Sequence, residues 1–281
     1  MRPDVRELDE FYSGQLGAVA RRLLAHRIRG VWPNVRDESL LGIGYAAPFM
    51  RLFRQESRRL LLSMPEEQGV IRWPPEGPFC SFLASETQIP LAASSVDKVL
   101  AVHCLELCES ARPLLREIWR VLSPEGRLLL IVPNRRGLWA RIDTTPFGHG
   151  HPYSKGQIER LLSDCLYTPT GLWPSLFMPP VHRPLILKTA VAWERVGHYA
   201  WPAFSGVLIV EAQKRIYAPI GKTAKAPKGK FQTVPAAASA SMACVLKQPW
   251  PAGQMVGALV HQSAPASAGA MRGGLCGWAL S

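Results

Sequence analysis

Residues 39–46 constrain the fold more than any other segment, because an apolar strand runs directly into a glycine-rich turn. The turn reads G-x-G-x-A, with Gly42, Gly44 and Ala46 at alternate positions. Small residues let the backbone turn sharply and let a ligand approach the main chain. Residues 48–59 are compatible with a helix, and a strand–turn–helix unit is where open α/β sheets commonly bind a nucleotide-like ligand.

The turn differs from two familiar phosphate-binding motifs. The dinucleotide fingerprint requires a third glycine three residues after the second, where this chain has Ala47. No Gly-Lys-Ser/Thr sequence follows the strand at this point. The turn therefore indicates a nucleoside-type ligand, and a purely structural tight turn is the alternative.

Apolar residues elsewhere alternate between helical spacing and short continuous runs. Helices are predicted over residues 5–30, 111–122 and 154–164, the last with Ser154 as its N-cap. Predicted helices and strands alternate along the chain, and this order predicts an α/β fold with a mostly parallel sheet. The predicted strands are 39–43, 59–63, 82–84, 96–102 and 127–132, then a strand from Trp193 onward and a last one at 206–212.

The composition changes after Tyr217, where Ala, Pro, Ser, Gly and Lys dominate and no periodicity persists. We therefore expect a folded domain over residues 1–217 and a low-complexity, disordered basic tail over 218–281. A small subdomain built on Trp250, Leu259, Leu275 and Trp278 is the alternative. A basic tail of this kind could contact an acidic partner, but such tails are more often simply solvated.

The net charge of +12 is unevenly distributed, because residues 218–281 contain six Lys or Arg side chains and no Asp or Glu. Residues 1–217 are therefore only modestly basic, which disfavours nucleic acid as a partner. No segment combines aromatic and basic residues in a nucleic-acid-binding motif.

The N-terminal sequence, the apolar runs and the cysteines bear on the compartment in which we expect the chain. The charged N-terminal sequence predicts no secretory signal, and the absence of an apolar run of about 18 residues predicts no membrane span. Cys104 and Cys108 form a lone C-x3-C, with no second pair or His cluster of metal spacing. We expect core thiols in a reducing cytoplasm and no metal site.

Four segments carry a resemblance to a known family. They are LLGIGYA at 40–46, IPLAASSVDKVLAVHCLEL at 89–107, LLREIWRVLSPEGRLLLIVPN at 114–134 and TPFGHGHPYSKGQI at 145–158. Over residues 5–215 the chain resembles the class I S-adenosylmethionine-dependent methyltransferases, in particular methyltransferase type 11. The resemblance implies a Rossmann-like sheet of seven strands with helices on both faces, and S-adenosyl-L-methionine as the cofactor.

The resemblance also implies cofactor contacts after each of the first four strands. The glycine turn approaches the methionine part, a carboxylate after the second strand binds the ribose, and polar groups after the third strand reach the adenine. Glu66 and Gln68 are alternatives to Glu67 for the ribose. The implied residues are Gly42, Gly44, Tyr45, Ala46, Glu67, Ser85, Glu86, His103, Cys104 and Leu105.

This chain departs from the family pattern at three positions. Leu40 stands where an acidic residue is frequent, Ala46 replaces a glycine, and Ser85 stands where an acid is frequent. Alanine still permits close approach of a ligand when φ is negative. The departures keep open the alternative of a catalytically degenerate fold that only binds a ligand or partner.

Methyl transfer displaces a leaving group at an activated carbon, so a base is needed only when the acceptor must lose a proton. His103 is the candidate base, with a structural histidine beside the cofactor as the alternative. Glu106 is interpreted as a helix-start residue, and the proline-rich segment 172–184 as a lid or as ordinary packing. The candidate substrate-binding residues are Arg135, His149, His151 and Tyr153.

The sequence therefore predicts a methyltransferase that acts on a small-molecule acceptor. An RNA methyltransferase is a weaker alternative, because the fourth strand does not end in the Asn/Asp-Pro-Pro-Tyr/Phe pattern of enzymes that methylate base amino groups.

Overall fold

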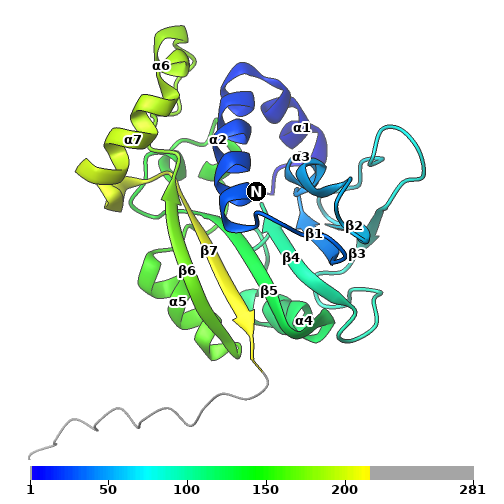
Figure 1. The fold of residues 1–281 in the computed structure, drawn as a ribbon. Helices are drawn as coiled ribbons and strands as arrows, with labels where there is room; N and C mark the ends of the chain where they lie inside the picture. Colours follow the sequence, from blue (N-terminus) through cyan, green and yellow to red (C-terminus); the bar gives the residue numbers. More distant parts are fainter. Residues whose placement is uncertain (1, 216–281) are drawn as a thin grey trace, which may run out of the picture. The chain divides into compact units, whose positions relative to one another are not determined.

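A computed structural model describes residues 2–215, which form a seven-stranded sheet flanked by helices (Figure 1). The strand order is β3-β2-β1-β4-β5-β7-β6, and β7 runs antiparallel to both of its neighbours while the other adjacent pairs are parallel. The predicted mostly parallel sheet of seven strands is confirmed. The strands are β1 (Ser39–Gly44), β2 (Arg59–Pro65), β3 (Ser81–Ala84), β4 (Val96–Val102), β5 (Leu122–Pro133), β6 (Tyr167–Ser175) and β7 (Val207–Lys214).

Seven α-helices and four short 3-10 helices connect these strands within the described residues. As predicted, Ser154 caps α5: its hydroxyl accepts a hydrogen bond from the Gln157 N–H, and its own N–H donates one to Oε1 of Gln157. The α-helices are α1 (Val5–Ser13), α2 (Gln15–Val31), α3 (Ala47–Met50), α4 (Ala111–Val121), α5 (Lys155–Asp164), α6 (Pro184–Lys188) and α7 (Ala190–Ala200). The 3-10 helices are η1 (Arg51–Phe53), η2 (Trp139–Arg141), η3 (Pro146–Gly148) and η4 (Pro202–Phe204).

Strand β5 is covered on both faces, which explains why its apolar residues do not alternate with polar ones. Leu128 and Leu130 pack on the face covered by α4 and α5, whereas Leu129 and Ile131 pack on the face covered by α1 and α2. Side chains of a strand alternate between faces, so a strand covered on both sides needs apolar residues at every position. The expected helices on both faces of the sheet are confirmed.

The predicted single helix over residues 5–30 is wrong, because the chain turns at Gly14 between α1 and α2. A Cβ at Gly17 would lie 1.9 Å from the Phe11 carbonyl oxygen, so the corner brings the two helices into close contact. Both helices bury their apolar faces in the same core, which explains why the helical periodicity continues through the corner.

Two other expectations about secondary structure need correction. Trp193 lies in α7, and the strand that precedes β7 is instead β6. Residues 172–184, expected to form a lid or ordinary packing, begin within β6, an edge strand in which Pro169 and Pro174 are tolerated. Behind the glycine turn, only α3 and η1 form before β2 begins at Arg59.

The predicted tail over 218–281 lies outside the described residues, as do Cys244 and Cys276. The four cysteines within the described part of the chain are free thiols. None of the helices in residues 2–215 combines the length and apolarity that crossing a membrane requires.

Candidate functional site

The glycine turn lies at the carboxyl end of β1, directly beside the end of β4. The Tyr45 N–H donates a 2.8 Å hydrogen bond to the Val102 carbonyl, and Gly44 has a φ of +70°. A Cβ at Gly44 would lie 2.4 Å from that same carbonyl oxygen, and one at Gly42 would lie 2.5 Å from Cδ2 of Leu62. Both glycines are therefore required by the contacts that β1 makes with its two neighbouring strands.

Helix α1 covers this turn with aromatic side chains. Tyr45 is buried and stacks on Tyr12, with ring centroids 5.6 Å apart and an interplanar angle of 15°. The Tyr45 hydroxyl donates to Oδ1 of Asp9 at 2.9 Å, and burial raises the pKa of this phenol. Ala46, the last small residue of the turn, is also buried.

A buried polar group follows the end of β4. The side chains of His103 and Glu106 are both 0% exposed, with Nδ1 of His103 3.3 Å from Oε1 of Glu106. On its other side, Nε2 of His103 lies 2.8 Å from the Tyr12 hydroxyl. Burial raises the pKa of Tyr12, and the negative charge of Glu106 raises it further.

This group is incompletely paired within the described residues. The geometry between His103 and Glu106 satisfies an ion-pair distance but not a hydrogen bond, and both carboxylate oxygens of Glu106 lack hydrogen-bond donors. A buried carboxylate without donors is costly, so this position favours a cation or a donor group. The interpretation of Glu106 as a helix-start residue is wrong, because α4 begins at Ala111 with Ser110 as its N-cap.

A second group gathers around Arg2 at the carboxyl ends of β2 and β3. The Arg2 guanidinium pairs with Glu86 and with Glu67, at 2.9 Å from Oε2 of the latter, and donates a 2.8 Å hydrogen bond to the Leu107 carbonyl. Burial raises the pKa of Glu86, and Arg2 opposes that shift. Ser85 joins these residues in lining a cavity of about 210 Å³.

The remaining predicted cofactor residues, Cys104 and Leu105, are buried just beyond β4. Burial raises the pKa of the Cys104 thiol. The Cβ of Cys104 would lie 2.9 Å from a Cβ added at Gly44, so these residues close one side of the turn. Within residues 2–215, no group of three or more His, Cys, Asp or Glu residues is arranged to hold a metal ion.

The four predicted substrate-binding residues have different surroundings in the structure. His149 lines a cavity of about 300 Å³ to which Arg2 also contributes. His151 is exposed and donates its N–H to the Glu106 carbonyl at 2.8 Å. The exposed Arg135 donates its N–H to the Tyr153 carbonyl at 3.0 Å, and the Tyr153 hydroxyl donates to a backbone carbonyl.

Two residues of the site were missed by reasoning from the sequence. Tyr12 fits the apolar periodicity of its helix, so nothing marks it as the partner of His103. Arg2 belongs to a charged N-terminal segment without a motif, and its contacts with Glu67 and Glu86 depend on the folded chain.

Comparisons with known proteins identify the kind of domain to which part of this chain is similar. Residues 42–130 match the family model of a methyltransferase domain, and this match confirms the resemblance to class I methyltransferases. That region extends from the glycine turn into β5. No curated protein matches the chain.

Solved structures show the same fold. A SAM-dependent methyltransferase from Thermotoga maritima is 13% identical, with a TM-score of 0.53, over 75% of this chain and 95% of that one. A structure of the complex between the Trm112 methyltransferase activator and a methyltransferase of Haloferax volcanii matches at 14% identity and a TM-score of 0.51. The second match covers 74% of this chain and 91% of that one.

Proposed function

From the methyltransferase domain that this chain carries, we propose that it transfers a methyl group from S-adenosylmethionine to a small-molecule acceptor. The observation that carries the proposal is the fully buried Glu106 carboxylate, which accepts no hydrogen bond from the described residues and lies just beyond the end of β4, the strand that adjoins the glycine turn. Ligands of open α/β sheets bind outside the carboxyl ends of the strands, where both features lie.

The residues at this edge fit the cofactor's chemistry. S-adenosylmethionine carries a sulfonium and an ammonium, and either cation would satisfy a buried carboxylate that lacks donors. Glu106 and His103 would hold the methionine part, Glu67 would accept hydrogen bonds from the ribose hydroxyls, and Glu86 would accept one from the adenine amino group. Bound there, the cofactor supplies an activated methyl group whose transfer is a displacement at carbon.

Arg2 competes with the cofactor for these carboxylates. Its guanidinium already engages Glu67 and Glu86, so binding of the ribose and adenine requires Arg2 to release at least one of them. The N-terminal segment and helix α1 therefore take part in cofactor binding in this proposal.

We assign His103 as the group that takes a proton when the acceptor must lose one. Its Nε2 lies 2.8 Å from the Tyr12 hydroxyl, so the acceptor's proton would pass to the Tyr12 oxygen as the Tyr12 proton passes to the imidazole, and Tyr12 ends neutral. Glu106 beside Nδ1 would stabilise the imidazolium that forms.

Calorimetric titration of the full chain with S-adenosylmethionine and S-adenosylhomocysteine tests the proposal. We expect micromolar binding to wild type and binding roughly tenfold or more weaker in Glu106→Gln, because the amide removes the charge that pairs with the cation. The same substitution should raise the stability of the ligand-free protein, because a neutral amide costs less to bury than a carboxylate that accepts no hydrogen bond.

Glu159→Gln is the matched control, since this carboxylate is on α5 and 41% exposed. It should leave cofactor affinity and stability unchanged. If wild type bound neither ligand, the methyltransferase proposal would be abandoned.

A second candidate, a methyltransferase fold that binds a partner without turnover, is favoured by one observation. The positions that Cβ atoms would take at Gly42 and Gly44 are filled by atoms of the protein itself. Cofactor titration separates the two candidates, because the binding protein need not retain affinity for S-adenosylmethionine.

A further inference from the structure

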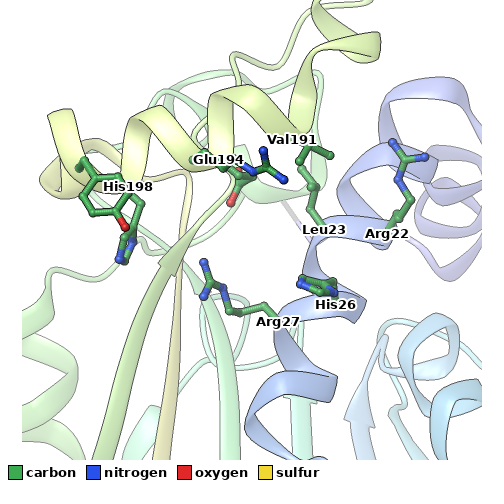
Figure 2. A pocket seen from close by; sticks show the side chains of 9 residues that line it. Arg22, Leu23, His26, Arg27, Val191, Glu194 and His198 are labelled. Carbon is green, nitrogen blue, oxygen red and sulfur yellow. The ribbon is translucent and has the colours of Figure 1, made fainter.

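A groove lies between α2 and α7, well along α2 from the corner at Gly14 (Figure 2). Its volume is about 670 Å³, which lies within the range of small-molecule sites. The lining positions recur at helical spacing on each helix, so one face of α2 is turned toward one face of α7. The lining residues are Arg22, Leu23, His26, Arg27, Val191, Glu194, Arg195, His198 and Tyr199.

The three arginines of the groove lack partners in the described part of the chain. Neither an ion pair within 4 Å nor a side-chain hydrogen bond involves Arg22, Arg27 or Arg195 there. Arg29, two residues further along α2, is by contrast paired with Glu56. Three guanidinium groups around one cavity repel one another, and a bound anion would relieve that repulsion.

The one carboxylate in the lining is engaged elsewhere. Glu194 accepts a 2.6 Å hydrogen bond from the Phe177 N–H and a 3.2 Å hydrogen bond from the Ser175 hydroxyl. Burial raises the pKa of Glu194, and the positive charge of Arg27 opposes that shift. Three guanidinium groups beside one carboxyl leave an excess of positive charge, and His26 and His198 add ring nitrogens that can donate hydrogen bonds.

Apolar side chains complete the lining. Val191 and Tyr199 are 47% and 87% exposed, and Leu23 lies opposite them on α2. Exposed large apolar side chains beside unpaired guanidinium groups suit a ligand with both an anionic head and an apolar body.

We propose that this groove binds a small anionic amphiphile, with a carboxylate or phosphate head among Arg22, Arg27 and Arg195 and an apolar body against Leu23, Val191 and Tyr199. Both head groups accept hydrogen bonds in the geometry of the guanidinium fork. The site is proposed irrespective of methyl transfer, and its occupancy does not require S-adenosylmethionine.

Calorimetric titration of the full chain with octyl phosphate, octanoate, 1-octanol and inorganic phosphate tests this proposal. We expect octyl phosphate, octanoate or both to bind, and the tighter of the two assigns the head group. Each should bind more tightly than 1-octanol and inorganic phosphate, because only the amphiphiles use both parts of the groove.

The double variant Arg27→Gln/Arg195→Gln should weaken binding by roughly a hundredfold, about tenfold for each guanidinium that no longer holds the anionic head. Arg116→Gln is the matched control, since Arg116 is an exposed arginine on α4, on the opposite face of the sheet. Thermal unfolding of each variant checks that it is folded.

The proposal is overturned if neither amphiphile binds, or if the double variant keeps wild-type affinity. It is equally overturned if 1-octanol or inorganic phosphate binds as tightly as the amphiphiles.

Discussion

The Tyr12 hydroxyl lies 2.8 Å from Nε2 of His103, which joins helix α1 to the residue that follows β4. Both side chains are buried, and the ring centroids of Phe147 and the imidazole lie 4.6 Å apart. Helix α1 is therefore a structural part of the candidate site, because it supplies a polar partner to the end of a central strand.

Replacing Tyr12 with Phe tests this relationship. The substitution leaves Nε2 of His103 buried without a partner, so we expect the free energy of unfolding to fall by about 1–3 kcal/mol. Urea denaturation measures the change. Tyr199→Phe is the control, because Tyr199 is 87% exposed and its hydroxyl makes no hydrogen bond among the described residues. Equal stability of Tyr12→Phe and wild type would contradict the assigned hydrogen bond.

The backbone of the glycine turn provides a second prediction. Gly44→Ala places a Cβ 2.4 Å from the Val102 carbonyl oxygen at a φ of +70°, so we expect a loss of more than about 2 kcal/mol in unfolding free energy. Gly30→Ala is the matched control in α2, where a Cβ meets nothing within 4 Å.

Because alanine is the better helix former, Gly30→Ala should stabilise the protein by about 0.5–1 kcal/mol. Urea denaturation of the two variants should give shifts of opposite sign. Shifts of the same sign would show that the turn lacks the close contact between β1 and β4.

Arg2 provides a third prediction, which concerns the cofactor. Arg2→Ala frees the carboxylates of Glu67 and Glu86, so S-adenosylmethionine should bind several-fold more tightly than to wild type. Titration calorimetry measures the two affinities. Arg6→Ala removes an exposed arginine from α1 and should leave the affinity unchanged. Weaker binding to Arg2→Ala would mean that Arg2 contacts the cofactor instead of competing with it.

The parts of the fold that could be predicted depend on contacts close in sequence. The turn at Gly44 and the cap at Ser154 follow from local backbone chemistry, and both occur at the predicted residues, whereas Gly42 lies within strand β1. Strand β6 was missed because its two prolines interrupt the apolar run, and its position at the sheet edge is set by β7.

The candidate site likewise contains one residue that could be predicted from local sequence and several contacts that could not. His103 could be proposed from its position after an apolar strand, since the carboxyl ends of parallel strands meet at one edge. Its contact with Tyr12, and those of Arg2 with Glu67 and Glu86, join residues far apart in the chain. No periodicity or motif encodes such pairs, so they require the folded structure.

Glu194 provides the last prediction, which concerns pH. Burial raises the pKa of this carboxyl above its ordinary value of 4.5, so the folded chain retains a proton that the unfolded chain has released. The free energy of unfolding should therefore fall as pH rises from 4.5 through the raised pKa, because the folded state binds more protons in that window.

In Glu194→Gln the amide oxygen can still accept the hydrogen bond from the Phe177 N–H, but the side chain no longer titrates. Its unfolding free energy should depend less steeply on pH than that of wild type, as urea denaturation at a series of pH values will measure. Glu159→Gln, which removes a half-exposed carboxyl from α5, should keep the wild-type slope. Identical slopes for wild type and Glu194→Gln would mean that Glu194 titrates alike in the folded and unfolded chains, and that its carboxylate can neutralise the arginines of the groove.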